Sequence, residues 1–444
     1  MGRACWTIPL DSPMISLMNH NAVPLDITAI ALSDEQQKIF HDIETSDSHF
    51  YITGKAGTGK SMLLQYLRHH THKKVVVVAP TGIAALNIGG QTIHSLFGIA
   101  PGLVAPESTA LHRRVGELLR HIEMVIVDEV SMVRADVMDA MDHVLRMSRR
   151  SSEPFGGVKM IMFGDLFQLP PVVERGLFPY FNDTYGGFYF FDAMVWRDTA
   201  MAVLVLGHIF RQKDAYFKEI LNGIRSGTPS EEMVDALNSR ANLYVPSGNI
   251  LTLATTNARV NQINAERMAQ LPGAVFAYEA TVSGALEPSA FPTEVVLHLK
   301  QGAQVMLIKN DKDRRWVNGS IGRVYRLTSD LVEVEIEGKI YEIKKEKWAK
   351  IRYVYQDESN SVKEEPMGAF TQFPLRLAWA VTIHKAQGLT YDTVAIDLGS
   401  GAFSHGQTYV ALSRCTTLEG VYLTRQVTPR DIIVDQRIVD FEGG

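Results

Sequence analysis

A glycine-rich stretch that ends in lysine and serine begins at Gly54. Its residues are Gly54, Lys55, Ala56, Gly57, Thr58, Gly59, Lys60 and Ser61. In a loop of this pattern, backbone N–H groups surround phosphates at a helix N-terminus, the lysine reaches the β- and γ-phosphates, and the serine hydroxyl binds Mg²⁺. The spacing therefore predicts a site for ATP and Mg²⁺, with Lys60 on the phosphates and Ser61 on the metal.

Two adjacent carboxylates, Asp128 and Glu129, follow an apolar run about 70 residues after this loop. A buried strand would deliver both side chains to the same edge of a sheet. Asp128 can hold the hydration shell of the Mg²⁺, and Glu129 can orient and deprotonate an attacking water. The combination predicts hydrolysis of ATP and not binding alone.

A parallel sheet is the element that could bring these groups together. Short β-branched runs alternate with helix-like stretches, and each run ends in a polar or glycine-rich turn. A first set of runs covers residues 50–53, 75–78, 124–127 and 160–163, and a second set covers 250–254, 394–397 and 421–424. We predict an α/β fold with two such domains.

The segment 291–373 interrupts the second set with a different pattern. Residues 304–308, 322–327, 331–337 and 339–343 read as short strands, and Asn318-Gly319 and Glu337-Gly338 read as tight turns between strands. We predict a small β-barrel inserted into the second α/β domain.

Composition bounds the class of protein. A chain of 444 residues exceeds the usual size of one hydrophobic core, and no run of about 18 apolar residues predicts a membrane span. The two cysteines, Cys5 and Cys415, lack the spacing of a metal site. A net charge of −5 means that any nucleic-acid contact depends on a local groove.

Read in order, the motifs resemble those of the Pif-one (petite integration frequency) helicases, in the 5′-to-3′ branch of helicase superfamily one alongside RecD. They cover residues 32–36, 54–61, 79–85, 128–132, 164–171, 210–212, 382–390 and 409–414. The resemblance implies two RecA-like P-loop domains, an SH3-like β insertion in the second and a small wedge element in the first. The implied boundaries are 1–31 for an N-terminal arm, 32–205 for the first domain with a wedge at about 97–115, 206–290 with 374–444 for the second, and 291–373 for the insertion.

The same resemblance assigns roles around the nucleotide. It implies that Gln36 reads the adenine and that Gln168 senses the γ-phosphate. Arg211 and Arg414 would be arginine fingers from the second domain, and Gln387 and Gly388 would lie near the phosphates.

Contacts with single-stranded DNA are expected where strands end on the P-loop side, in both domains. The implied residues are Pro80, Thr81, Gly82, His94, Ser95, Thr256, Asn257, Thr382, His384 and Lys385. Leu96 and Phe97 are candidates to stack on or wedge between bases, although a Leu-Phe pair more commonly belongs to a hydrophobic core. A further DNA surface is expected from the insertion, through Lys309, Lys312, Arg314, Arg315, Lys344, Lys345, Lys347 and Lys350.

The resulting hypothesis is a DNA-dependent ATPase that moves 5′ to 3′ on single-stranded DNA and unwinds duplex at single-strand/double-strand junctions. G-quadruplexes and RNA–DNA hybrids are open as further substrates, with roles in DNA repair, recombination and telomere maintenance. We expect a monomer, with dimers on DNA left open, and no membrane partner. The near-minimal length favours a bacterial or phage origin and the cytoplasm, or the nucleus or mitochondrion in a eukaryote. The alternatives are a translocase or remodeller that unwinds duplex poorly, and a DNA-binding module without catalysis.

Overall fold

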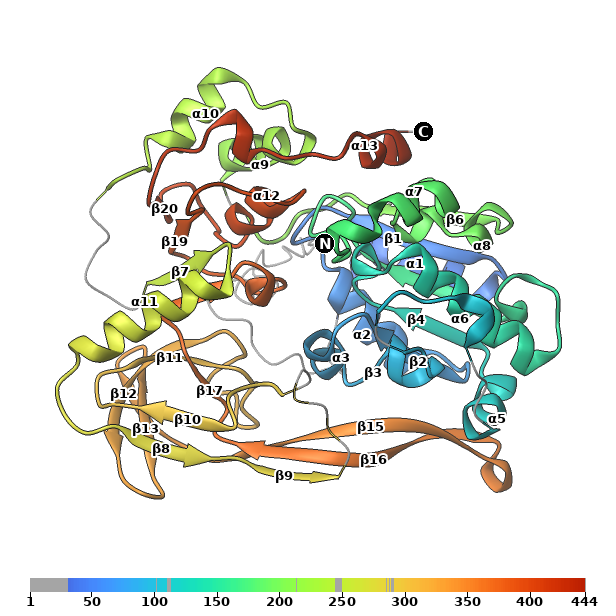
Figure 1. The fold of residues 1–444 in the computed structure, drawn as a ribbon, viewed down its shortest axis with the longest axis horizontal. Helices are drawn as coiled ribbons and strands as arrows, with labels where there is room; N and C mark the ends of the chain where they lie inside the picture. The colour runs from blue at the N-terminus through green and yellow to red at the C-terminus, as the bar shows by residue number, and fades with distance from the viewer. Residues whose placement is uncertain are drawn as a thin grey trace, which may run out of the picture.

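The computed structural model (Figure 1) describes residues 31–100, 102–109, 113–212, 214–243, 250–284, 286, 288 and 291–443. The arm expected at 1–31 lies outside the described residues except for Ala31. Figure 1 shows two α/β parts beside each other and an all-β part below the second. The predicted fold class is confirmed. No helix among the described residues is long and apolar enough to cross a membrane.

The first sheet has six parallel strands in the order β3-β2-β4-β5-β1-β6. Its strands are β1 (His49–Gly54), β2 (Val75–Ala79), β3 (Gln91–Thr92), β4 (Met124–Val127), β5 (Lys159–Phe163) and β6 (Met201–Leu206). The strands β4 and β5 are buried along their whole length, as apolar runs covered on both faces must be. All carboxyl ends therefore meet at one edge.

Helices cover both faces of this sheet. They are α1 (Asp34–Thr45), α2 (Lys60–His70), α3 (Gly82–Ile88), α4 (Ile93–Phe97), α5 (Arg113–His121), α6 (Ala135–Arg149), α7 (Phe178–Tyr185) and α8 (Met194–Arg197). Leucines and isoleucines of α1 and α2 pack with Ile52, Ile126 and Ile161 in one core. Side chains of α5 and α6 pack with Val125 and Val127 in the other. Successive side chains of each strand point into one core and then into the other. Packing in both cores therefore fixes the position of each strand end.

The second sheet has four parallel strands in the order β18-β7-β19-β20. They are β7 (Leu251–Ala254), β18 (Ala380–Thr382), β19 (Val394–Asp397) and β20 (Val421–Leu423), accompanied by the helices α9 (Ala215–Ser226), α10 (Glu231–Asn238), α11 (Asn257–Gln270), α12 (Gln407–Leu412) and α13 (Gln436–Gly443). The last helix, α13, packs against the first domain, where the Phe441 ring contacts Tyr51, Phe190, Phe191 and Trp196. The end of the chain thus ties the two domains together.

The all-β part consists of three antiparallel sheets, ordered β14-β13-β12-β11-β17, β15-β16-β9 and β10-β8, and the described strands form no closed barrel. Its strands are β8 (Phe276–Glu279), β9 (Thr281–Gly284), β10 (Val296–Leu299), β11 (Gln304–Leu307), β12 (Ile321–Leu327), β13 (Val332–Ile336), β14 (Lys339–Ile343), β15 (Glu346–Gln356), β16 (Ser361–Gln372) and β17 (Leu375–Leu377). Two strands precede the expected boundary at residue 291 and one follows residue 373. The strands β15 and β16 form a long hairpin, which Figure 1 shows reaching toward α5.

The tip of this hairpin is fastened to the first domain. The Tyr353 hydroxyl accepts a hydrogen bond from the Val77 N–H at 3.3 Å, and the Tyr353 N–H donates to Gln91 Oε1 at 3.0 Å. The Tyr355 ring stacks on His121 with 3.6 Å between centroids. The insertion therefore contacts both α/β domains.

The expected wedge is only partly described. Pro101 and residues 110–112 lie outside the described part, and Pro106–Ser108 forms a single 3-10 turn. Leu96 and Phe97 are buried, at 2% and 1% exposure, in the core beneath α4. Of the two roles expected for this pair, the structure supports the core role. Both side chains pack in the apolar core against the sheet, so neither is exposed to stack on or wedge between bases in this conformation.

Candidate active site

The glycine-rich loop connects β1 to α2 and leaves no room for side chains at its glycines. Gly57 and Gly59 have φ values of 85° and 84°, in the left-handed region that favours glycine. A Cβ on Gly57 would lie 2.5 Å from the Cβ of Arg211. Lys60 Nζ donates to the carbonyls of Gly54 and Lys55, at 2.5 and 3.1 Å. The loop is therefore curled around its own lysine, as a phosphate-binding loop requires.

Asp128 and Glu129 stand at the carboxyl end of β4, as the sequence predicts. Burial and the charge of Glu129 raise the pKa of Asp128 to about 7. Burial also raises the pKa of Glu129, while Lys60 and Arg414 oppose the rise. Glu129 has a φ of 50°, an uncommon backbone conformation for a side chain other than glycine. The strained turn keeps both carboxylates at the sheet edge, where nearby cations offset only part of the rise in their pKa values.

A glutamine from the second domain joins two groups of the first. Gln387 Nε2 donates to Glu129 Oε2 at 3.1 Å and to Gln168 Oε1 at 3.2 Å. Gln168 Nε2 in turn donates to Asp165 Oδ2 at 3.1 Å. The residues expected to activate water and to sense the γ-phosphate thus share one hydrogen-bond network across the domain boundary.

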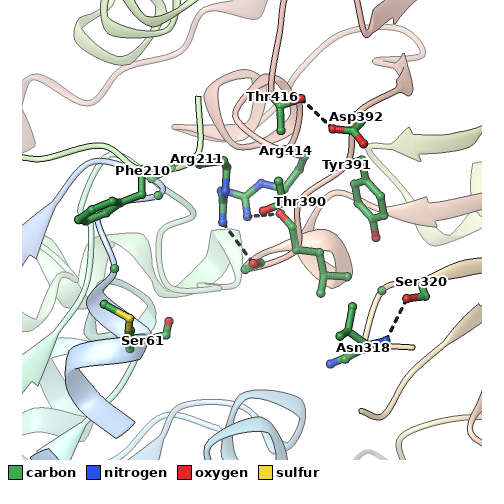
Figure 2. Close-up of a pocket in the computed structure, with 18 of the residues that line it drawn as sticks. Ser61, Phe210, Arg211, Asn318, Ser320, Thr390, Tyr391, Asp392, Arg414 and Thr416 are labelled. Atoms are coloured by element: carbon green, nitrogen blue, oxygen red, sulfur yellow. Dashed lines mark hydrogen bonds between the residues drawn. The ribbon is translucent and has the colours of Figure 1, made fainter. Parts of the chain in front are cut away.

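The two arginines lie beside each other, as Figure 2 shows, and each is held by backbone carbonyls of the second domain. Arg211 donates to Ser413 O and Gly388 O, both at 3.2 Å, and Arg414 donates to Leu389 O at 3.3 Å. Burial, together with the charge of Arg414, lowers the pKa of Arg211. The guanidinium groups are weakly neutralised cations, well suited to an incoming anion.

Arg211 differs from the expectation in its origin. It lies in the connection between β6 and α9, and the neighbouring Phe210 N–H donates to Gly57 O at 2.9 Å. Its backbone therefore packs on the P-loop while its guanidinium bonds to the second domain. Of the two arginines, only Arg414 comes from the body of the second domain.

A cavity of about 770 Å³ lies between these groups. Its walls come from four parts of the molecule: residues 56–62, Glu129 and Gln168 of the first domain, Phe210 and Arg211 of the connection, 388–393, Arg414 and Thr416 of the second domain, and 317–321 with Glu337 of the insertion. Figure 2 shows Ser61 and Phe210 on one side and Asn318 and Ser320 on the other. The cavity is large enough for a nucleotide, whose sites usually span about 300–1,000 Å³.

Several residues assigned to the nucleotide do not form the cavity wall: Gln36, Gly54, Asp128 and Gln387. Gln36 is fully buried, where its Nε2 donates to Gly59 O at 3.4 Å and its Oε1 accepts from the Ser33 N–H at 3.1 Å. Its side chain takes part in the capping box of α1 and hydrogen-bonds to the end of the phosphate-binding loop.

Sequence reasoning missed contributors from distant segments. The Tyr409 hydroxyl accepts a hydrogen bond from the Ala56 N–H of the P-loop at 3.0 Å. The turn around Asn318 and Gly319 reaches the cavity from the insertion. Tyr409 opens the motif that ends at Arg414, so its position was visible in the sequence, but nothing in the local pattern of Asn318 points to this site.

The DNA-contact candidates of the first domain gather at the carboxyl ends of β2 and β3. Pro80, Thr81 and His94 line a second cavity of about 230 Å³ together with Arg134. The Thr81 hydroxyl caps α3 by accepting the Ala84 N–H at 3.2 Å. Burial and the charge of Arg134 lower the pKa of His94, which keeps its ring neutral at pH 7.

Those of the second domain occupy the matching edge of the second sheet. Thr382 at the end of β18 pairs in register with Ala254 at the end of β7. The Thr256 hydroxyl caps α11 by accepting the Arg259 N–H, and the Thr382 hydroxyl accepts the Lys385 N–H, both at 3.3 Å. Asn257 and Lys385 are exposed beside these caps. Each sheet thus presents capped helix starts at its carboxyl edge.

Three of the eight cations expected to form a DNA surface on the insertion have acceptors within the all-β part. Arg315 bonds to Asp311 at 2.7 Å, Lys309 bonds to Glu346 at 2.8 Å, and Lys345 donates to the Glu279 carbonyl at 2.8 Å. Arg315 also lies over the Trp316 ring. These contacts weaken the expectation that this patch attracts phosphates.

Comparison with known proteins agrees with this geometry. The family model for PIF1-like helicases matches residues 31–234. The chain is 33% identical to the ATP-dependent DNA helicase Pif1 of Bdellovibrio bacteriovorus, covering 94% of this chain and 93% of that protein. It is 35% identical to ATP-dependent DNA helicase PIF1 of Danio rerio, covering 97% of this chain and 67% of the relative, and spans 64% of the Emericella nidulans relative.

Solved structures give the same result. Bacteroides sp Pif1 in complex with ADP-AlF4 is 38% identical and superposes with a TM-score of 0.86 over 93% of this chain and 97% of that one. Bacteroides Pif1 bound to ssDNA is 39% identical over the same shares, with a TM-score of 0.70.

Proposed function

Because the chain belongs to the PIF1-like helicase family, we propose that it is an ATP-dependent DNA helicase that moves 5′ to 3′ on single-stranded DNA and unwinds duplex at junctions. The observation that carries this proposal is the shared cavity. Lys60 and Glu129 of the first domain face Arg414 of the second across a space of nucleotide size. The family relationship supports the helicase activity, and the polarity and the residue roles are our proposals.

The residues around the loop fit Mg²⁺, which favours oxygen ligands and keeps several of its waters. The Ser61 hydroxyl and the Asp128 carboxylate would hold it. Asp128 has a pKa raised by burial and by Glu129, an arrangement that a divalent cation would reverse. Bound there, Mg²⁺ would neutralise charge on the β- and γ-phosphates.

The protein's own groups then have defined tasks. Lys60 exchanges its two backbone carbonyls for phosphate oxygens. Glu129 accepts the proton of the attacking water, and Gln168 contacts the γ-phosphate. Arg211 and Arg414 release the carbonyls of the second domain to stabilise charge that develops on the γ-phosphate.

Hydrolysis would move DNA because the same two domains carry the capped helix starts. Closure around ATP brings the edge with Thr81 toward the edge with Thr256 and Thr382, and release of products separates them. Backbone N–H groups at helix N-termini bind phosphates without reading bases. Alternate grip on the two edges moves the strand in one direction. In a bacterium this substrate places the protein in the cytoplasm.

Unwinding of a duplex with either a 5′ or a 3′ single-stranded tail tests the proposal. We expect ATP-dependent separation from the 5′ tail alone, and none by Lys60→Ala. Separation from the 3′ tail alone would contradict the polarity.

A second candidate is a translocase or remodeller with weak duplex unwinding. The burial of Leu96 and Phe97 favours it, because these side chains do not protrude as a wedge. Strong ATP turnover on single-stranded DNA with little separation of either tailed duplex would support this candidate, and removal of proteins from the strand would then be the activity to measure. G-quadruplexes and RNA–DNA hybrids are alternative substrates for the same assay.

A further inference from the structure

A charged cluster lies next to the nucleotide cavity without lining it. Arg225 on α9 extends from the second domain to Asp165, which follows β5 in the first, and the two side chains pair at 3.2 Å. The Asp165 side chain is fully buried and that of Arg225 is 15% exposed. A buried pair of this kind has a high desolvation cost, so a role beyond stability is a reasonable hypothesis.

Asp165 determines which end of the Gln168 side chain faces the second domain. An ionised carboxylate only accepts hydrogen bonds, so the nitrogen of the Gln168 carboxamide must point to it. The oxygen then points the other way, to Gln387. Burial opposes ionisation of Asp165, but the charges of Arg225 and Lys60 outweigh it and lower the pKa of this carboxyl. Without Arg225, one of the two charges that keep Asp165 ionised would be missing, and only the ionised carboxylate is restricted to accepting hydrogen bonds.

The guanidinium of Arg225 is fixed by more than its charge. It lies 3.7 Å from the centroid of the Phe167 ring, and Phe167 is the neighbour of Gln168. The Phe167 N–H also donates to Asp165 Oδ1 at 3.2 Å. A planar guanidinium can stack and form hydrogen bonds at once, which a lysine ammonium cannot do.

The cluster has a third side from the C-terminal helix α13. Glu442 Oε2 lies 3.9 Å from Arg225 Nη2, and Glu442 Oε1 accepts hydrogen bonds from Thr53 and Tyr51 of β1 at 3.1 and 3.3 Å. Arg225 therefore contacts Asp165 and Phe167 on the loop that carries Gln168, and it contacts Glu442, which in turn bonds to the strand that leads into the P-loop.

We propose that Arg225 is a positioning residue of the ATPase centre, which holds Asp165 so that Gln168 presents its carboxamide oxygen toward Gln387 and the cavity. The proposal rests on the proposed function. Through Arg225, the placement of α9 governs the group that senses the γ-phosphate. The turnover of ATP would therefore depend on Arg225, whereas the affinity for ADP would not.

Steady-state ATP hydrolysis with saturating single-stranded DNA tests this role, with kcat and KM measured separately. We expect Arg225→Gln to lower kcat about tenfold, a size typical of coupling within one hydrogen-bond network, with ADP affinity within about twofold of the unchanged protein. Arg225→Lys, which keeps the charge and protects the fold, should still lower kcat about threefold because stacking is lost. A wild-type kcat in Arg225→Lys would overturn the proposal.

A double-mutant cycle separates positioning from general damage. In a Gln168→Ala background, Arg225→Gln should change kcat by less than about twofold, because the group it positions is gone. Equal losses in both backgrounds would overturn the proposal.

Arg425→Gln is the matched control, since it breaks another arginine pair with a buried aspartate, Asp431, away from the cavity wall. It should leave kcat unchanged. If the unmodified protein showed no DNA-stimulated hydrolysis, the proposed function would fail instead.

Discussion

The first sheet leads into a glycine-rich loop and two carboxylates. The described part of the second sheet leads into no such loop and contributes Arg414 to the cavity wall and Gln387 to the hydrogen bonds beside it. Both sheets are parallel, and both begin helices with threonine caps at the carboxyl edge, at Thr81 and at Thr256. The threonine-capped helix starts, which both sheets have, are suited to a DNA strand that passes both domains. The nucleotide groups, which differ between the sheets, are suited to a reaction that is complete only when the domains meet.

This division predicts that defects in the nucleotide groups of either sheet stop hydrolysis, whereas defects in the caps weaken the hold on DNA. Four substitutions test the division, in decreasing order of expected effect, and a fifth, away from both kinds of group, measures a purely structural ion pair.

Arg414→Ala should have the largest effect, because it removes the cation that the body of the second domain supplies. We expect kcat for ATP to fall about 10³-fold, as for other arginine fingers. ADP binding, followed by fluorescence, should persist, and Arg414→Lys serves as a control for folding. If turnover fell less than about tenfold, the first sheet and the connection would suffice for chemistry.

Glu129→Gln should lower kcat about 10²-fold, since the loss of a general base typically costs this much or more. Binding of single-stranded DNA, measured by anisotropy, should change less than about twofold because the residue lies off the DNA edges. Turnover near the wild-type rate would assign the base to another group.

Thr81→Ala and Thr256→Ala should weaken DNA binding by similar factors, about three- to tenfold, if each hydroxyl or its cap contributes about 1 kcal/mol. Ser230→Ala removes a comparable cap on α10, where the hydroxyl accepts the Met233 N–H at 3.2 Å. This control should lose stability without losing DNA affinity. An effect confined to Thr81 or to Thr256 would show that the two edges are not equivalent grips.

The smallest effect on activity should come from Arg425→Gln, whose effect on stability can be measured by chemical denaturation across pH. Burial opposes ionisation of Asp431, but hydrogen bonds from Arg425 and Thr428 hold the pKa of that carboxyl well below its usual range. A depressed pKa stabilises the fold above the unfolded value near 4, and this contribution is lost as the pH falls through the acid range. The variant should cost about 1–2 kcal/mol at pH 7, discounted because Arg425 is 32% exposed, and less below pH 4. A cost that did not shrink in acid would assign it to packing.

The sequence predicts the parts of this molecule that depend on local pattern. The strand ends at Gly54, Val127 and Asp397 lie within a residue of expectation, because apolar runs and punctuating turns are short-range signals. The three-residue strand β18 (Ala380–Thr382) is not among the predicted runs, because it is too short to give such a signal. The pairing of Arg225 with Asp165 joins residues whose separation hides any pattern. The burial of Phe97 was also beyond local reasoning, since the same Leu-Phe pair fits either a core or a base stack.

ATP hydrolysis with and without single-stranded DNA tests the central claim most directly, namely that one cavity between two DNA-contacting sheets couples the reaction to the strand. We predict strong stimulation of kcat by DNA, and its loss in Arg414→Ala. An equal rate with and without DNA would contradict the account and would leave a nucleotide-binding protein whose two edges serve some other purpose.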